Sequence, residues 1–591
     1  MTTIATQQPN RQSLRLLTPY LRPYKTMAIV APLLMLLEVA MDLFQPRLMQ
    51  NIVDVGLAQL DMAYVLRTSL VMVGVATIGM LGGAGNGILS TRLGQDYGYD
   101  LREALYRRIQ SLSLANLDRL GTGELVTRLT NDVTQIQEIL VMVLRMLVRT
   151  PLLMVGALAM LILTSPRLSI IMLLLGPLVT VGLLQIHRRA HKLFTAVQQA
   201  IDGVNTVTQE NLASVRVVKA FVRQRHEINR FQRAIDTLMQ RFIHAERTVM
   251  LFGPMLMIAM NVGIVSVIWF GGRMVINGSA HVGQLLASIN YLMITLSSLM
   301  MVGMMLTRLS RSMASAERLA EVLSSVPAIV DSPTALQELP GEGRIRLIDV
   351  GFAYGDESGA PVLSGINLEV EPGQTLAILG ATGSGKSTLV HLIPRYYDTS
   401  AGSVLVDGVD VREVSQQTLR RTVGVVMQDP VLFTGTIRDN LRYGRPEASD
   451  AEIERAARMA QAHDFILSFP DGYDTLIGQR GVNLSGGQKQ RLAIARALVT
   501  EPSILILDDS TSSVDVATEA RIREAIENEM AGVTRIIVAQ RISSVLHADK
   551  IIVLEGARIV AQGTHDELMI SSPVYREIYD SQLGNGVAID G

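Results

Sequence analysis

The stretch from Leu484 to Asp515, LSGGQKQRLAIARALVTEPSILILDDSTSSVD, joins a glycine-rich turn to a strand-like run that ends in two carboxylates. The turn, Leu484 to Gln488, opens a predicted helix, so its backbone N–H groups can meet the γ-phosphate of a nucleotide. The apolar run Ile504 to Leu507 is typical of a buried strand, and Asp508 and Asp509 follow it directly. The stretch therefore predicts an α/β domain with a phosphate site.

The two carboxylates have different expected roles. Asp508 is placed to hold Mg²⁺. The next position needs a base for the attacking water, and Asp509 is one methylene shorter than glutamate. Withdrawing a carboxylate by about 1 Å can cost on the order of 10²-fold in rate. The sequence therefore predicts an intact phosphate-binding turn and an impaired base.

A second glycine-rich loop follows another predicted strand. The apolar run Leu376 to Leu379 leads directly into GATGSGKS, Gly380 to Ser387, which matches the phosphate loop G-x-x-x-x-G-K-[ST] in its strand-to-helix context. Lys386 is expected to reach the β- and γ-phosphates, and the Ser387 hydroxyl to ligate Mg²⁺. The predicted nucleotide-binding residues of this loop are Gly380, Thr382, Gly383, Gly385, Lys386, Ser387 and Thr388.

These motifs occur together and in the order found in the ATP-binding cassette (ABC) family, which the chain resembles over nearly its whole length. The resemblance implies ATP and Mg²⁺ as cofactors. It also implies that two cassettes dimerise head to tail, so that the signature turn of one chain closes over the nucleotide held by the other. The residues of this chain that would contact the partner's ATP are Ser485, Gly486, Gly487 and Gln488.

The same resemblance assigns expected roles to other positions. Tyr354, in FAY, corresponds to the ring that stacks on adenine, although an ordinary strand aromatic is the plainer alternative. Gln428, in VVMQDP, corresponds to a glutamine that contacts Mg²⁺. Asp515, in the loop after the base, would cross the dimer interface.

Gln540, in IIVAQR, stands where the family normally places a histidine that clamps the γ-phosphate. Glutamine can donate a hydrogen bond, but it cannot become cationic or move a proton. Asp509 and Gln540 therefore depart from the family pattern at one site whose nucleotide-binding residues are intact. This combination predicts a site kept for binding and a heterodimeric partner that supplies the missing glutamate and histidine.

The N-terminal half has the composition of a membrane domain. The 591 residues are 48% hydrophobic with a mean hydropathy of +0.30, and the long apolar stretches lie before about residue 310. The segment His187 to Thr248 carries eleven Arg or Lys, which predicts cytoplasmic loops and termini in a plasma or inner membrane protein. Six spans are predicted, at Met27–Phe44, Val65–Ile88, Ile139–Leu163, Leu168–Ile186, Val249–Phe270 and Leu285–Leu306.

The predicted fold class is a six-span α-helical ABC exporter membrane domain of type IV followed by an α/β nucleotide-binding domain. Two polar, helical loops resemble the coupling segments of such exporters, although plain solvated helices are the alternative. The predicted organisation is 1–26 with an interfacial elbow helix, 27–313 membrane domain with coupling loops 91–138 and 187–248, 314–344 linker, 345–580 nucleotide-binding domain and 581–591 tail.

Charged residues within the predicted spans form two pairs. Glu38 and Asp42 lie one helical turn apart in the first span, and Arg145 and Arg149 repeat that spacing in the third. Intramembrane charges usually face a cavity or a partner, so the pairs predict either a substrate path or an interface salt bridge. Methionine also concentrates there, with 24 of 29 before residue 310, which suits either an adaptable pocket or ordinary helix packing.

The function predicted from the sequence is ATP-driven export of amphipathic or hydrophobic compounds by a heterodimer. A homodimeric slow exporter or lipid flippase is an alternative in the same class. An ATP-gated regulatory membrane protein without sustained transport is an alternative of another class. The net charge of −1 gives no indication of nucleic-acid binding, which would need a basic face.

Overall fold

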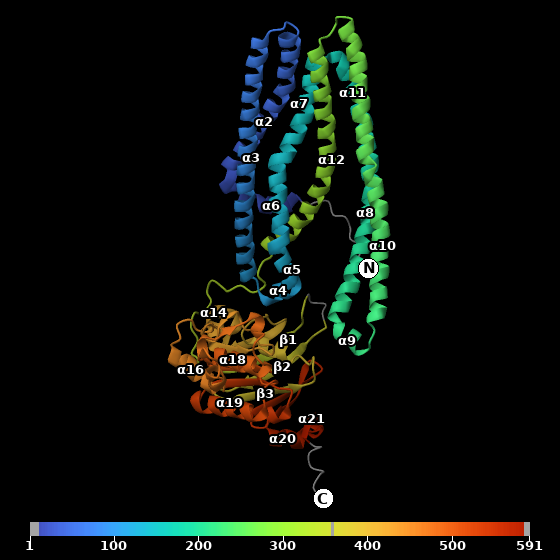
Figure 1. The fold of residues 1–591 in the computed structure, drawn as a ribbon. Coiled ribbons are helices and arrows are strands. Elements are labelled where there is room, and N and C mark those ends of the chain that lie inside the picture. The colour runs from blue at the N-terminus through green and yellow to red at the C-terminus, as the bar shows by residue number, and fades with distance from the viewer. Residues whose placement is uncertain (1–10, 356–359, 584–591) are drawn as a thin grey trace. The chain divides into compact units, whose positions relative to one another are not determined.

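The computed structural model describes residues 11–355 and 360–583 of the chain (Figure 1). It divides into two compact units. The first takes in the chain up to Gln110 and Thr122–Ser325, and the second takes in Ser111–Gly121 and the chain from Val326 on. The short segment Ser111–Gly121 thus belongs to the second unit although both of its chain neighbours belong to the first.

The first unit is helical, and it contains six candidate membrane spans among the described residues. The predicted six-span architecture is therefore confirmed. Its elements are α1 (Arg11–Leu17), η1 (Thr18–Tyr24), α2 (Lys25–Asn51), η2 (Ile52–Leu57), α3 (Met62–Ser111), α5 (Thr122–Thr127), η3 (Arg128–Asp132), α6 (Val133–Met142), η4 (Val143–Leu147), α7 (Val148–Thr164), α8 (Pro166–Ala213), α9 (Val215–Ala220), α10 (Gln224–Met250), α11 (Phe252–Ile276) and α12 (Val282–Ser324).

Several of these helices are much longer than a bilayer requires. The 50 residues of α3 would span about 75 Å at a rise of about 1.5 Å per residue, against a hydrocarbon core of about 30 Å. Figure 1 shows α8 and α10 side by side over most of their length. The helix α12 continues to Ser324, past the predicted domain boundary at 313, because RSMASAERLAEVLS contains no proline or glycine and Pro327 is the first helix breaker.

Small residues and ion pairs hold the helices of the first unit together. A Cβ at Gly82 would lie 3.0 Å from the backbone oxygen of Leu34, so glycine permits the close approach of α2 and α3. Arg318 of α12 pairs with the buried carboxylate of Asp132 in η3, at 2.5 Å from Nη2 to Oδ1. This pairing fixes the end of α12 beside η3.

The second unit contains the segment helix α4 (Leu114–Leu120) and a mixed α/β domain. Its central sheet has the strand order β12-β11-β3-β10-β9-β6, parallel except for the edge strand β12. A second, antiparallel sheet has the order β2-β1-β4-β5, and β7 pairs with β8. The strands are β1 (Ile345–Phe352), β2 (Leu363–Val370), β3 (Thr375–Gly380), β4 (Ala401–Val406), β5 (Val409–Asp410), β6 (Val423–Val426), β7 (Gly435–Thr436), β8 (Leu476–Ile477), β9 (Ile504–Asp508), β10 (Thr534–Val538), β11 (Lys550–Glu555) and β12 (Arg558–Gly563).

Helices cover this sheet and connect its strands. The helices are α13 (Lys386–Leu392), α14 (Gln416–Thr422), α15 (Ile437–Arg442), α16 (Asp450–Met459), α17 (His463–Leu467), α18 (Gly486–Leu498), α19 (Val516–Glu529), α20 (His565–Ser571) and α21 (Pro573–Leu583), and short 3₁₀ turns are η5 (Val411–Glu413), η6 (Gly472–Asp474), η7 (Gln479–Gly481) and η8 (Ile542–Ser544).

The parallel strands bring the site residues to one edge of the sheet. The register aligns Val538 of β10 with Ile378 of β3 on one side and with Asp508 of β9 on the other. The central strands β3 and β9 are buried on both faces, and every residue of β9 is buried. Because parallel strands end at the same edge, the loops after β3, β9, β10 and β6 meet there.

Candidate active site

The phosphate loop lies between β3 and α13. Its last glycine, Gly385, caps α13 with φ +96°, and a Cβ there would lie 2.9 Å from the backbone oxygen of Val362. The Lys386 amine donates to the backbone oxygens of Gly380 at 2.8 Å and Ala381 at 2.9 Å. Burial lowers the pKa of Lys386, while the carboxylates after β9 oppose that shift. Two backbone carbonyls therefore hold the Lys386 amine against the phosphate loop.

Replacing Gly385 with alanine is expected to lower the free energy of unfolding of this unit by about 1–3 kcal/mol, because alanine is strained at this φ and its Cβ meets Val362. Thermal or denaturant unfolding of the purified chain measures the change. Gly383→Ala is the matched control: its φ is +83°, and a Cβ there has no neighbour within 4 Å. Equal losses for both variants would show that backbone strain alone sets the cost.

Ser387 and Asp508 form the part of the site that suits a magnesium ion. The Ser387 hydroxyl donates to Asp508 Oδ1 at 3.0 Å, and Asp508 is 3% exposed. Burial raises the pKa of Asp508, partly offset by the Ser387 hydrogen bond. One hydroxyl and one carboxylate are ligands that Mg²⁺ takes together with substrate phosphates, so these residues fit the ion. They would hold Mg²⁺, which would supply charge neutralisation at the phosphates.

Asp509 is bonded by two amides. Its backbone is left-handed, with φ +47°, and its N–H donates to the backbone oxygen of Val538 at 3.0 Å. One carboxylate oxygen, Oδ2, accepts from Gln540 Nε2 at 2.7 Å and from Gln428 Nε2 at 3.3 Å. Burial and the neighbouring Asp508 raise the pKa of Asp509. The structure thus brings Gln540, expected at the γ-phosphate, and Gln428, expected at Mg²⁺, into hydrogen-bond contact with the expected base Asp509.

Tyr354 lies just after β1, beside the helix that follows the phosphate loop. Its side chain is 47% exposed, and its hydroxyl lies 3.0 Å from Thr388 Oγ1. Phe352 and Tyr397 both contact the ring edge-to-face, at centroid distances of 4.9 Å and 5.4 Å. The exposed ring is available to a planar base.

The signature turn begins α18. The Ser485 hydroxyl accepts from Gln488 N–H, and the Gln488 side chain accepts from Ser485 N–H at 2.8 Å, which forms a capping box. Gly486 and Gly487 occupy the first turn, and a Cβ at Gly487 would lie 2.9 Å from the backbone oxygen of Ser513. Asp515 caps α19 by accepting from Thr518 N–H at 2.9 Å, which lowers the pKa of Asp515.

The structure shows residues that sequence analysis did not identify. His391 of α13 places Nε2 at 3.8 Å from Asp508 Oδ2, and burial lowers the pKa of His391. Gln490 of α18 is 3% exposed and bonds both Ser512 Oγ at 3.1 Å and Ser513 N–H at 2.9 Å. Gln490 thereby fixes the loop after Asp509 to the signature helix. A glutamine one turn into a helix offers no sequence signal for such a contact.

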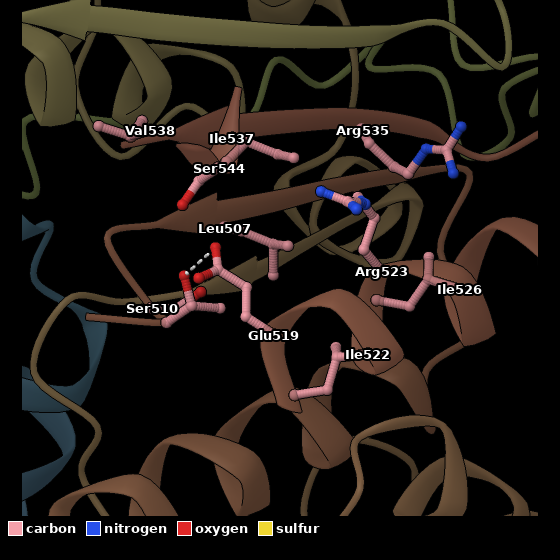
Figure 2. Close-up of a pocket in the computed structure, with 11 residues that line it drawn as sticks. Leu507, Ser510, Glu519, Ile522, Arg523, Ile526, Arg535, Ile537, Val538 and Ser544 are labelled. Atoms are coloured by element: carbon pink, nitrogen blue, oxygen red, sulfur yellow. Dashed lines mark hydrogen bonds between the residues drawn. The ribbon is translucent and has the colours of Figure 1, made fainter. Parts of the chain in front are cut away.

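A small pocket of about 40 Å³ lies between α19 and the ends of β9 and β10 (Figure 2). Thr511 Oγ1 donates to Glu519 Oε1 at 3.0 Å, and both residues line the pocket. Ile522 and Ile526 form its apolar wall. The hydrogen bond holds the chain directly after Asp509 and Ser510 against α19.

Three of the four charged residues singled out in the membrane spans meet. Arg149 Nη2 lies 3.2 Å from Glu38 Oε1 and 2.9 Å from Asp42 Oδ2. Arg145 has no salt bridge to any carboxylate among the residues that the structure describes. A cavity of about 940 Å³ is lined by Met35, Met80, Met142 and Met146 together with Glu38, Glu138, Arg145 and Arg149.

Comparison with known proteins identifies relatives over nearly the whole chain. The family model described as ABC transporter transmembrane region matches residues 28–299, and the one described as ABC transporter matches residues 363–512. The uncharacterized ABC transporter ATP-binding protein YfiB of Bacillus subtilis (strain 168) is 40% identical, over 96% of this chain and 98% of that protein.

Two further similarities concern lipid and transport. The ATP-dependent lipid A-core flippase of Syntrophus aciditrophicus (strain SB) is 36% identical, over 84% of this chain and 82% of that protein. A solved structure of a bacterial Atm1-family ABC exporter with ATP bound superposes with a TM-score of 0.79 at 28% identity, covering 95% of this chain and 99% of the other.

Proposed function

Because this chain belongs to the ABC transporter family, as an exporter half with fused membrane and nucleotide-binding domains, we propose that it is the degenerate-site subunit of a heterodimeric exporter. Its own site binds MgATP through Lys386, Ser387, Gln428 and Asp508, and it hydrolyses ATP slowly. Its signature turn completes the partner's competent site. The nucleotide-binding domain faces the cytoplasm of a plasma or inner membrane, which the basic residues between His187 and Thr248 support.

The observation that carries this proposal is the hydrogen bonding of Asp509. Two amide groups donate to one oxygen of its carboxylate, and the nearer of them, Gln540 Nε2, lies 2.7 Å away. An amide cannot accept a proton from the base or become cationic beside a phosphate. The short carboxylate is therefore tied to groups that bind and orient but do not relay protons, while the phosphate loop keeps all residues of its G-x-x-x-x-G-K-[ST] motif.

The intact signature turn supports an unequal pair over a homodimer. Ser485, Gly486 and Gly487 have the helix-capping geometry that a phosphate-binding turn needs. In a homodimer this turn would serve only slow sites. In a heterodimer it serves a site where the partner provides glutamate and histidine. Dimer closure on ATP then drives the inward-to-outward conformational change, and hydrolysis in that site resets it.

The decisive measurement is ATP turnover in lipid, for this chain alone and for this chain together with a candidate partner. We expect fast turnover only from the pair, and we expect replacement of the partner's catalytic glutamate with glutamine to lower it by about 10²-fold or more. Rapid hydrolysis and export by this chain alone would contradict the degenerate-site proposal. ATP binding without any transport by the pair would favour the regulatory alternative.

We further propose that the substrate is an amphipathic compound, with lipid as the leading class. The relative named as a lipid A-core flippase supports lipid. The methionine-lined cavity offers an adaptable apolar surface beside charged groups. Arg149 is neutralised by Glu38 and Asp42, whereas Arg145 lacks such a partner among described residues, so Arg145 is available to a polar head group.

Arg145→Gln is expected to lower stimulation of ATP turnover by anionic lipid by about tenfold, because a charge-assisted hydrogen bond contributes about 1.5–3 kcal/mol. The assay compares the pair in vesicles with and without anionic lipid. A neutral amphiphile should stimulate parent and variant equally. Unchanged stimulation by anionic lipid would remove Arg145 from the substrate path.

A further inference from the structure

A cluster of three aromatic rings surrounds the proposed adenine position. Phe352 is buried at the end of β1, and its ring contacts Tyr354 at 4.9 Å and Tyr397 at 5.6 Å between centroids. Tyr354 and Tyr397 meet edge-to-face at 5.4 Å, with an interplanar angle of 87°. A base that stacks on Tyr354 therefore restricts the motion of the Tyr354 ring, which is in edge-to-face contact with Tyr397.

Tyr397 also forms a hydrogen bond with α4, the helix in the segment Ser111–Gly121. Its hydroxyl donates to Asp118 Oδ2 at 2.5 Å. Burial and this hydrogen bond raise the pKa of Tyr397 well above its usual range, so the hydroxyl keeps its proton at neutral pH. Both residues belong to the same compact unit, although 279 positions separate them in the chain.

The two ends of this contact are held in place by their own neighbours. The Asn116 amide of α4 donates to the backbone oxygen of Val326 at 3.2 Å, and its oxygen accepts from Ala328 N–H at 2.9 Å. On the other side, Arg395 is 5% exposed and bonds Asp398 Oδ1 at 2.8 Å, which fixes the loop that carries Tyr397. The Tyr397 hydroxyl lies between these two supports, so a substitution can remove it and leave both supports in place.

We propose that Tyr397 is a positioning residue that couples adenine stacking on Tyr354 to the placement of α4 through its hydrogen bond to Asp118. This inference depends on the proposed ATP site, because it takes Tyr354 as the residue on which the base stacks. The segment α4 is joined in the chain to α3 and α5 of the membrane unit. Its placement is therefore the point at which base occupancy of the nucleotide site can reach the membrane helices, independently of the phosphates.

The test places a spin label on α4 in the full chain in lipid. The chain has no cysteine, so Arg119→Cys at an exposed position of α4 gives a single labelling site. MgATP is expected to change the label's mobility in this background, and Mg-tripolyphosphate, which lacks the base, is not. Tyr397→Phe should lower the equilibrium constant of the response by about tenfold, since it removes a hydrogen bond to a charged group.

ATP affinity separates this role from a general loss of structure. Tyr397→Phe keeps the ring, so the affinity for a fluorescent ATP analogue should change by no more than about twofold. Asp118→Ala should match Tyr397→Phe, and the double variant should be no worse than either one, because both remove the same bond. Asp118→Asn keeps an acceptor oxygen and should retain most of the response.

Tyr396→Phe is the matched control, since it removes a hydroxyl from the adjacent ring and should leave the response unchanged. A full response of Tyr397→Phe, or a full response of the parent to Mg-tripolyphosphate, would overturn the inference. If the parent chain did not bind MgATP at all, the proposed ATP site would be overturned as well. Slow turnover is measured separately, so failure of the degenerate-site proposal is distinguishable from failure of this one.

Discussion

Replacing Asp509 with glutamate and Gln540 with histidine together raises ATP turnover by this chain, assayed alone in lipid, by about 10²-fold or more. Glutamate restores the reach of the base by one methylene. Histidine removes the nearer of the two amides that bond Asp509 Oδ2 and adds a group that can carry a proton. Both signature turns of a self-associated chain are intact, so these two positions limit the rate.

Control variants separate the base from the histidine. Gln540→His alone leaves the short carboxylate, and Asp509→Gln combined with Gln540→His restores the histidine without any base. Neither should exceed the parent by more than about tenfold, because each leaves the water without a well-placed proton acceptor. A parent chain that already matches the double variant would show that Asp509 is an adequate base.

Gly487→Asp abolishes turnover by the pair, with an expected loss of about 10²–10³-fold. The new Cβ would lie 2.9 Å from the backbone oxygen of Ser513, and the carboxylate would oppose the γ-phosphate of the nucleotide bound by the partner. Steady-state ATPase assays of the pair measure the loss. MgATP binding in this chain's own phosphate loop should stay intact, since Gly487 belongs to the opposite site.

Because the two ATP sites of the proposed pair differ, the same substitution should have different effects in the two chains. The equivalent substitution in the partner's signature turn disables only the degenerate site, and it should cost far less turnover. Gly486→Ala is a mild control, because its Cβ would lie 3.5 Å from Ser513, an ordinary contact distance. Equal losses from both signature turns would indicate two equivalent sites and would contradict the unequal pair.

The parts of the fold that the sequence predicted correctly are those with strong local patterns. Long apolar runs marked the six spans, and the phosphate loop sat in a strand-to-helix context that the structure retains between β3 and α13. The extension of α12 to Ser324 was harder to foresee, since a charged amphipathic helix and a polar linker have similar compositions. Its ion pairs, Arg318 with Asp132 and Glu321 with Arg128, distinguish the helix from a linker.

The site itself could be predicted as a set of residues but not as an arrangement. Motif matching assigned Asp509 to the attacking water, Gln540 to the γ-phosphate and Gln428 to Mg²⁺, but the hydrogen bonds of both glutamines to Asp509 depend on strand register and on its left-handed backbone. Tyr397 carried no motif that sequence analysis used. Its partner Asp118 lies 279 positions away, and pairwise contacts over such distances leave no trace in one sequence.

The membership of α4 in the nucleotide-binding unit has a consequence for biosynthesis. A ribosome makes Asn116 and Asp118 more than 200 residues before their partners, since the three contacts span 210, 212 and 279 positions. Contacts of such high sequence separation form late. The segment between α3 and α5 therefore lacks these partners until translation has passed Val326 and Ala328 and, for the bond to Asp118, Tyr397. The placement of α4 is therefore complete only after the second unit has been translated as far as Tyr397.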